Sequence, residues 1–380
     1  MADLVVRRAA RVFGWDLDGP LAVVIRGGVI ETVMAERDVA VDLPELDAGG
    51  RAVIPGFVDA HTHLAFAGDR ADEFAARLAG RPYEAGGIMR TVEATRAATF
   101  EELVGETVRR AGSCVAGGTT TIEVKSGYGL DVATERRLLE VVAAAATQTD
   151  AELAPTFLGA HLAPDPSYVD LVVEEMLPAC AGLAVSCDAF CDVGAMTVEQ
   201  SRRVLEAGRR HGLVPRIHAE ELAWTGGARL AAEVGCLSAD HLVHATPEDA
   251  AALAAAGVVA VLLPATSFCL RSAYAPARML VDAGVQIALA TDCNPGTSYT
   301  TSMPFVVALA CSAYGLSVDE AIRAATEGGA RALGRSDIGH LRPGARADLV
   351  VLAGDHWVDI AYQPGMPQVA VVVKDGVAVR

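Results

Sequence analysis

The sequence predicts an α/β protein with a (β/α)8 TIM-type barrel and a small β-sandwich domain formed from both termini. Eight apolar or β-branched runs of strand length alternate with helical patterns in the middle of the 380-residue chain. This alternation is typical of parallel sheets whose strands are connected by helices. No G-x-G-x-x-G motif follows the first run, so we expect a closed barrel rather than an open doubly wound sheet.

The two ends of the chain differ from the middle in their pattern of apolar and polar residues. Both consist of short β-like runs separated by Gly, Pro and Asp, and the last run contains Asp375-Gly376, a common hairpin turn. We therefore expect residues 1–52 and 341–380 to form one discontinuous small β domain. Residues 53–340 are expected to form the barrel.

The elements of the barrel follow one another in a regular order. The clearest helical patterns occupy Thr134–Ala146, Thr197–His211 and Pro247–Ala256, the last of which has a proline in its first turn. The strands between such helices are apolar because both faces of a parallel sheet are covered. The expected barrel strands are Val53–Ala60, Thr119–Lys125, Ala154–Ala160, Val185–Asp192, Val214–Ala219, Ser238–His244, Val258–Pro264 and Val285–Thr291.

Composition argues against several classes of partner and location. Lys and Arg number 31 against 48 Asp and Glu, and the resulting net charge of −17 disfavours binding to nucleic acid or to an anionic membrane surface. The eight cysteines are scattered without paired C-x-x-C spacing, which is typical of reduced thiols in a cytoplasmic protein. Residues 250–270 carry no formal charge, but Gly257 and Pro264 interrupt them. A helix end and a core strand are therefore favoured there over a membrane span.

Polar residues suited to catalysis gather where the predicted strands end. His61 and His63 follow the first strand, and a spacing of two directs both side chains to one side of a strand. Active sites of (β/α)8 barrels lie at the C-terminal ends of the strands, so residues far apart in sequence are expected to converge there. The set comprises His61 and His63 on strand one, His161 on strand three, His218 and Glu221 on strand five, Asp240 and His241 on strand six, and Asp292 on strand eight.

Three imidazoles and one carboxylate from this set suit an ion such as zinc or iron, with one coordination position left for water. The ion would activate that water for hydrolysis. Glu221, His241 and Asp292 are the candidates for proton transfer, and the sequence does not separate the two possible roles of Asp292. The expected metal ligands are His61, His63, His218 and Asp292.

Two alternatives stay open for this site. Lys125 could be a modified lysine that bridges two ions, but it ends strand two and strand four offers no lysine, so a single ion is favoured. His244 would take the place of His241 if strand six were shifted in register.

Several segments resemble those of a known family. PGFVDAHTH, the strand-five histidine, TDCNPG and GARADLVVL resemble the metal-dependent amidohydrolase superfamily. HTHLAFAGDR, RLAGRPYEAGGIMRTVEATRAAT, EVKSGYGL, FLGAH, IHAEEL, ADHL and TDCNPGTS resemble, in order and over nearly the whole chain, segments of the imidazolonepropionases within it. The chain departs from that pattern after Glu84, where it passes directly to Ala85-Gly86-Gly87 and omits a few residues near Arg70 in the sequence.

The resemblance implies hydrolytic ring opening of 4-imidazolone-5-propanoate to N-formimidoyl-L-glutamate, a step of histidine degradation. It implies one divalent or trivalent ion per subunit, zinc or iron, and a catalytic pair formed by Glu221 and His241. It also suggests a homodimer. Arg70 would bind the propionate, because a guanidinium binds a carboxylate through two hydrogen bonds. The implied substrate contacts are Arg70, Tyr128, His161, Asn294, Gly296 and Thr297.

Two other functions compete with this one. Another amidohydrolase, such as a deaminase or a lactam hydrolase, would act on a different small heterocycle, and a deaminase would release ammonia. A catalytically silent barrel used for binding or assembly would hold no ion, although every expected ligand position is filled in this chain.

Overall fold

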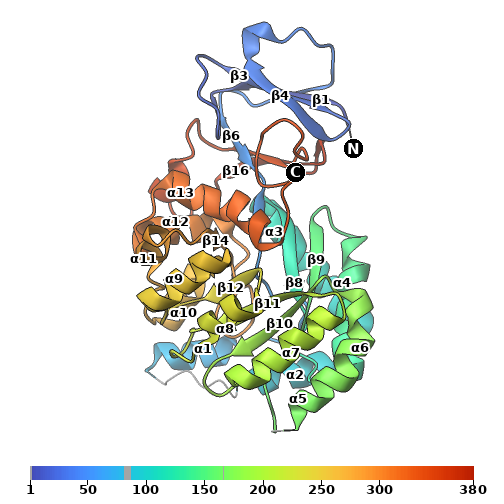
Figure 1. Ribbon diagram of the computed structural model, residues 1–380. Coiled ribbons are helices and arrows are strands. Elements are labelled where there is room, and N and C mark those ends of the chain that lie inside the picture. Colours follow the sequence, from blue (N-terminus) through green and yellow to red (C-terminus); the bar gives the residue numbers. More distant parts are fainter. Residues whose placement is uncertain (1, 81–86, 166) are drawn as a thin grey trace.

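The computed structural model describes residues 2–80, 87–165 and 167–380. Figure 1 shows a barrel surrounded by helices and, at one end of it, a smaller group of strands built from the N-terminal and C-terminal segments. The predicted fold class is confirmed, because the described residues form one eight-stranded sheet and two smaller sheets, one of N-terminal strands and one that combines strands from both ends of the chain.

The barrel strands lie side by side in sequence order, and all neighbouring pairs are parallel. The first and last strands meet through Asp59, which accepts hydrogen bonds from the backbone amide and the hydroxyl of Thr291. A parallel bridge between Thr62 and Cys293 continues this junction. The strands are β7 (Phe57–Asp59), β8 (Thr119–Lys125), β9 (Glu152–Ala160), β10 (Ser186–Cys191), β11 (Val214–Ala219), β12 (Ser238–His241), β13 (Val259–Leu262) and β14 (Ile287–Leu289).

The helices cover the outside of the barrel (Figure 1). Local sequence sets several of their starts through capping boxes, in which a Thr or Ser side chain and an acidic or amide side chain three residues later exchange hydrogen bonds with the first turn. The three helices predicted from the sequence are confirmed as α4 (Val132–Ala146), α7 (Val198–Arg210) and α9 (Pro247–Ala256). The others are α1 (Ala71–Leu78), α2 (Ile88–Ala97), α3 (Phe100–Ala116), α5 (Tyr168–Leu171), α6 (Leu177–Cys180), α8 (Gly227–Val234), α10 (Pro264–Leu270), α11 (Ala277–Asp282), α12 (Met303–Tyr314), α13 (Val318–Arg323), α14 (Gly329–Ala332) and α15 (Asp359–Tyr362), with 3-10 turns at Glu36–Asp38 and Ala181–Leu183 and π-turns at Val172–Met176 and Ala324–Gly328.

The smaller sheets share one buried apolar cluster that includes Val6, Ile25, Val53, Leu349 and Val373. Because these side chains come from both ends of the chain, burying them joins the termini into one unit. One sheet has the order β4-β3-β1-β5 and the other the order β17-β16-β15-β6-β2. Their strands are β1 (Leu4–Ala9), β2 (Arg11–Val12), β3 (Leu21–Arg26), β4 (Val29–Ala35), β5 (Glu45–Asp47), β6 (Ala52–Pro55), β15 (Leu349–Leu352), β16 (Val369–Lys374) and β17 (Val377–Ala378).

The prediction of one continuous strand from Val53 to Ala60 is wrong. The chain changes sheets at Gly56, so that β6 pairs with β15 in the small domain and β7 starts the barrel. A Cβ atom at Gly56 would collide with the Thr120 side chain, so only glycine fits this close crossing. The division of the chain between residues 52 and 53 remains a prediction, and β6 (Ala52–Pro55), which pairs within the small domain, crosses it.

The sixth strand is shorter than predicted and ends at His241. His241 and Leu242 have φ angles of 76° and 56°, a left-handed conformation that ends the extended run. The uncharged stretch 250–270 consists of the end of α9, then β13 and α10. In the described part of the chain, no helix combines the length and the apolar character that a membrane crossing requires.

Candidate metal centre and catalytic pocket

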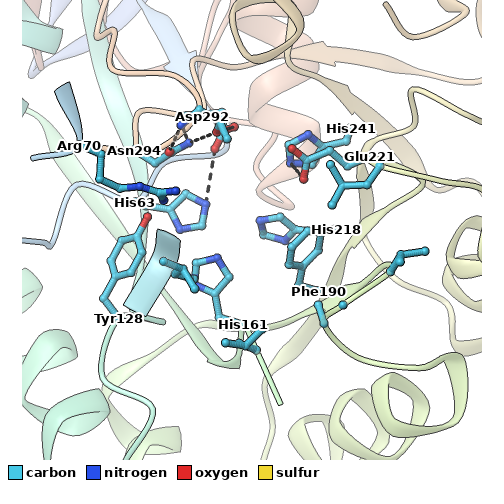
Figure 2. Close-up of a pocket in the computed structure, with 17 residues that line it drawn as sticks. His63, Arg70, Tyr128, His161, Phe190, His218, Glu221, His241, Asp292 and Asn294 are labelled. Atoms are coloured by element: carbon cyan, nitrogen blue, oxygen red, sulfur yellow. Dashed lines mark hydrogen bonds and ion pairs between the residues drawn. The ribbon is translucent and has the colours of Figure 1, made fainter. Parts of the chain in front are cut away.

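A cavity lies at the C-terminal ends of the barrel strands, where the sequence predicted the site. Figure 2 shows Glu221 and His241 on one side of it, Arg70 and Tyr128 on the opposite side, and His63 between them. His61 is fully buried beside this cavity. The predicted residues that line it are His63, Arg70, Tyr128, His161, His218, Glu221, His241, Asp292, Asn294 and Thr297.

The predicted ligands form a compact cluster. One ring nitrogen each from His61, His63 and His218 lie within 4.8 Å of one another. The Nε2 atoms of His61 and His63 are 3.6 and 3.5 Å from Oδ1 of Asp292. His241 also has a nitrogen within 4.8 Å of ligand atoms of His61 and Asp292, so it lies at the edge of the same space.

The buried atoms of this cluster are suited to an ion. The Nε2 atoms of His61 and His218 are buried and have no hydrogen-bond partner among the described residues. Buried polar atoms are rarely left without a partner, because each loses its hydrogen bonds to water. Two such imidazole nitrogens, one of them 3.6 Å from the Asp292 carboxylate, are what a bound divalent cation would satisfy, so the residues present fit the metal that the sequence predicts.

Carboxylates behind the rings set which nitrogen faces the cavity. Oδ2 of Asp240 is 2.6 Å from Nδ1 of His61, and Oδ1 of Asp188 is 3.2 Å from Nδ1 of His218. A carboxylate is an acceptor, so each Nδ1 carries the proton and each Nε2 keeps its lone pair. This carboxylate–histidine arrangement is typical of metal centres.

Two buried cations neutralise these carboxylates. Lys125 donates hydrogen bonds to Glu123 at 2.9 Å and to Asp188 at 2.7 Å. Arg216, also fully buried, is 3.5 Å from Asp240 and donates to the carbonyl oxygens of Ala60 and Ala332. The Lys125 ammonium is thus used within the barrel as a hydrogen-bond donor to two carboxylates, which favours the single-ion alternative over a modified bridging lysine.

Burial shifts the pKa values of the predicted ligands and of His241. It lowers the pKa of His61, His63 and His241 well below the ordinary value, so these rings are neutral. Burial also raises the pKa of Asp292 to about 6, although Thr266 donates a 2.6 Å hydrogen bond to its Oδ2. A cation at the cluster favours the ionised carboxylate, so binding of the ion is expected to lower this pKa.

We expect Asp188→Asn to weaken ion binding by about 10- to 100-fold, as is usual when a partner of a ligand histidine is lost. The asparagine NH2 group would face either Lys125 or His218, and both are donors here. Titration of the apoprotein with zinc in the presence of a competing chelating dye measures this affinity.

Asp348→Asn is the matched control, because Asp348 is also a buried carboxylate paired with a lysine, Lys374 at 2.7 Å, but it lies in the small domain. Equal zinc affinities of the Asp188 and Asp348 variants would rule out the orienting role of Asp188.

Glu221 and His241 face each other across 3.6 Å between Oε2 and Nε2. Burial, and secondarily repulsion by Asp292, raise the pKa of Glu221 well above its ordinary value. A carboxyl group shifted in this direction holds its proton more strongly than one in water. His244 is exposed and does not line the cavity, so the alternative with a shifted register is wrong.

Arg70 lies between two glycines. A Cβ atom at Gly87 or at Gly296 would meet its guanidinium, so a larger residue at either position would displace the arginine from its present place. Glu73 accepts 2.7 Å hydrogen bonds from Nε and Nη2 of Arg70 and fixes the plane of the group. The shortened loop at Glu84 and Ala85 lies outside the described residues.

Two further rings line the cavity, Tyr128 on the side of Arg70 and His161 between Tyr128 and Phe190 (Figure 2). His161 stacks on His63 with an interplanar angle of 18°, and its Nδ1 is 2.9 Å from the Gly127 carbonyl oxygen. A carbonyl accepts only, so Nδ1 carries the proton and Nε2 of His161 is an acceptor. The ring of Tyr128 lies 5.3 Å from that of His161, centroid to centroid.

Asn294 organises the loop after the last strand. Its Oδ1 accepts from the amides of Gly296 and Thr297, and its Nδ2 donates to the Asp292 carbonyl and to the Thr297 hydroxyl. These contacts hold Gly296 against Arg70 and Thr297 in the cavity wall. The predicted substrate contact of Asn294 remains a prediction.

Sequence reasoning missed several residues that build the site. Phe190 and Val193 line the cavity, and Asp188 orients His218. Their signal was present, because Asp188 and Phe190 are two apart and therefore lie on one face of the strand. The run CDAFCD contains no histidine, however, and was interpreted only as a buried strand.

The chain is similar to known proteins over nearly its whole length. The model of the amidohydrolase family matches residues 52–379. An imidazolonepropionase from Mycolicibacterium smegmatis is 50% identical over 93% of this chain and 90% of that relative. One from Halobacterium salinarum is 50% identical over 94% and 91%, and one from Streptomyces coelicolor is 51% identical over 94% and 91%.

Solved structures support the fold. A crystal structure of 5-methylcytosine deaminase from Klebsiella pneumoniae has a TM-score of 0.80, covering 99% of this chain and 97% of that one at 16% identity. Identity this low supports the architecture alone. With the matching family model and relatives that are half identical, the chain belongs to the amidohydrolase family and, within it, to the imidazolonepropionases.

Proposed function

We propose that this chain hydrolyses 4-imidazolone-5-propanoate to N-formimidoyl-L-glutamate. The observation that carries the proposal is one cavity with a buried imidazole–carboxylate cluster at its floor, the pair Glu221 and His241 on one side and Arg70 on the other. A cyclic amide with an anionic arm matches both ends of this cavity. Water adds to the ring carbonyl carbon, the ring C–N bond breaks, and a proton reaches the released nitrogen.

Arg70 binds the propionate. It is the cation that lines the described part of the cavity wall, in a protein of net charge −17, and the two glycines beside it leave room for its guanidinium. Tyr128 and His161 hold the ring, with the acceptor Nε2 of His161 available to a ring N–H. Because Arg70 and Glu221 lie on opposite sides of the cavity, anchoring the carboxylate presents the ring to the proton-transfer pair (Figure 2).

Glu221 manages the protons of the reaction. It lines the cavity and faces His241, where it can take a proton from water and return it to the ring nitrogen as the C–N bond opens. His241, whose pKa is lowered so that it stays neutral, donates a hydrogen bond to the carbonyl oxygen as that oxygen gains charge. Asp292 stays with the ligand cluster, because its Oδ1 is near His61 and His63 and its Oδ2 accepts a hydrogen bond from Thr266.

One zinc or iron ion per subunit would be held by His61, His63, His218 and Asp292. When bound, it would polarise the carbonyl and make water more acidic. Three nitrogen donors and one oxygen donor suit either metal.

The direct test is product analysis. Purified, metal-loaded protein is incubated with fresh 4-imidazolone-5-propanoate, and the product is identified by mass. We expect a gain of one water without release of ammonia. Ammonia released from a nucleobase, with no turnover of the imidazolone, would instead favour a deaminase.

Arg70→Met should raise KM for the propionate substrate with little change in kcat. Removing one partner of a buried charge pair costs about 2 to 5 kcal/mol, which corresponds to a rise of roughly 30-fold or more. Steady-state kinetics with the intact substrate and with an imidazolone that lacks the propionate arm measure the effect, and only the intact substrate should lose affinity.

Arg90→Met provides the control. Arg90 is ion-paired with Asp72 in the same region, but it is 54% exposed and does not line the cavity. If the two variants had the same KM, Arg70 would not be the propionate site.

The proposal also covers location and partners. We propose that the chain works in the cytoplasm, since each of its eight cysteines is free. The charge of −17 makes nucleic acid an unfavourable partner. The homodimer suggested by the family remains a prediction, which sedimentation would test.

A further inference from the structure

Two loops at the mouth of the barrel carry the residues proposed to act on the substrate. Glu221 lies in the loop after β11, and Tyr128 lies in the loop after β8. Neither loop forms a helix or strand over these residues, so regular backbone hydrogen bonds do not hold them. A buried carboxylate from outside each loop accepts several of its backbone amides. Glu220 within the first loop and Arg96 beside the second add further hydrogen bonds.

Asp192 holds the loop of Glu221. Its Oδ2 accepts from the amides of Glu221 at 2.7 Å and Leu222 at 2.9 Å. Its Oδ1 accepts from the amides of Ala223 at 3.2 Å and Val193 at 2.7 Å. Asp192 directly follows β10 and is 4% exposed, so a rigid barrel strand fixes the backbone from which Glu221 projects.

Glu135 holds the loop of Tyr128 in the same way. Its Oε2 accepts from the amide of Gly127 at 2.8 Å, and its Oε1 accepts from the amides of Gly129 at 2.6 Å and Leu130 at 3.0 Å. Glu135 is fully buried in the first turn of α4.

The Tyr128 loop is shaped around Glu135. Gly127 has φ of +105°, and a Cβ atom at Gly129 would collide with the Glu135 amide and carboxylate. The amides on both sides of Tyr128 therefore point at one anion.

Only a carboxylate can accept hydrogen bonds from all the backbone amides that surround Asp192 or Glu135. Each oxygen of Asp192 accepts two N–H groups, and each oxygen of Glu135 accepts at least one. An amide side chain has a single acceptor oxygen, and its NH2 group would face backbone donors. Replacement by Asn or Gln therefore leaves the amides that face the new NH2 group without an acceptor, while the volume of the side chain is nearly preserved.

We propose that Asp192 and Glu135 are positioning residues with separate tasks, Asp192 fixing Glu221 for proton transfer and Glu135 fixing Tyr128 for substrate binding. This inference rests on the proposed function. A merely structural role for the two carboxylates would make both variants lose activity together with stability. Separate tasks predict that the kinetic effects divide between kcat and KM.

The experiment compares Asp192→Asn and Glu135→Gln in the full-length, metal-loaded protein. Loss of one hydrogen bond costs about 1.4 kcal/mol, which corresponds to about a tenfold change in a kinetic constant. We expect Asp192→Asn to lower kcat about tenfold with KM unchanged, and Glu135→Gln to raise KM about tenfold with kcat unchanged.

Glu320→Gln serves as the control. Glu320 also accepts a backbone amide, that of Ser317 at 2.7 Å, but it does so at the start of α13, away from the cavity wall. This variant should keep both kinetic constants. Metal content and melting temperature are measured on all samples.

Amide hydrogen exchange gives a readout that does not need turnover. Asp192→Asn should speed exchange at Glu221, Leu222 and Ala223, and Glu135→Gln at Gly127, Gly129 and Leu130. If either amide variant does not fold, the alanine variant, in which water can fill the vacated space, replaces it under the same criteria. Kinetic losses that fall equally on kcat and KM in both variants, or exchange that rises in both loops at once, would overturn the separate tasks.

The same data distinguish this proposal from the proposed function. If wild-type protein does not turn over the imidazolone, the proposed function fails, and with it the assignment of tasks in that reaction. Local exchange then still decides whether each carboxylate holds its own loop. Turnover by wild type, with both variants kinetically normal, overturns the positioning roles alone.

Discussion

Replacing His218 by alanine will remove both the bound ion and the activity. His218 comes from β11 and supplies a buried Nε2 that has no other partner among the described residues, so no neighbouring group takes over its bond. A metal acting on a carbonyl and a water contributes several kcal/mol to the transition state, so the loss corresponds to roughly a thousandfold or more in kcat/KM. Elemental analysis and the imidazolone assay on one sample measure both effects.

His244→Ala is the matched control for that variant, since His244 is an exposed histidine just past β12. It should keep its ion and its rate. A His218 variant that retained a full complement of metal would show that the ligand set is wrongly assigned, whatever its activity.

Replacing Glu221 by glutamine will reduce kcat while leaving the ion in place. Glu221 lines the cavity but belongs to neither group of clustered ligand atoms, so the ion does not depend on it. Loss of a general acid–base group lowers kcat by about 10²- to 10⁴-fold. Stopped-flow measurement of a single turnover separates this chemical step from product release.

Metal content and rate together distinguish a metal ligand, His218, from a proton-transfer residue, Glu221. The His218 variant should lose metal and rate together, whereas the Glu221 variant should lose rate alone. A Glu221→Gln protein with a normal single-turnover rate would transfer the proton role to His241 or Asp292.

The sequence predicted the cluster because strand ends obey a simple geometric rule. His61, His218 and Asp292 are separated by long stretches of chain, but the parallel barrel brings their strand ends to one mouth. Their chemistry was also visible, since histidine and aspartate are the ligand types that zinc and iron take. Position and residue type together were sufficient.

The support beneath the cluster was harder to predict. Lys125 and Asp188 are 63 residues apart, and their contact depends on the relative register of several strands. The interior polar side chains do follow a period of two, as in Glu123 and Lys125 or Arg216 and His218, which places each pair on the inner face of its strand. Which carboxylate meets which ring follows only from three-dimensional packing.

The change from one sheet to the other at Gly56 could not be predicted from residue types alone. The run from Val53 to Ala60 is uniformly apolar, and burial in two different sheets requires the same residue types as burial in one. Only the close contact with Thr120 distinguishes the glycine as a crossing point. The roles of Asp192 and Glu135 could not be predicted from the sequence, because their partners are backbone amides, which nearly every residue has.

The most direct test of a single-metal hydrolase is reconstitution of the apoprotein. Protein freed of metal by a chelator receives zinc or iron in steps, and the loss of imidazolone absorbance is followed at each step on samples of known metal content. We expect no turnover without metal, followed by a linear rise that ends at one ion per chain. Full turnover by metal-free protein, or a rise that continues to two ions per chain, would contradict the account.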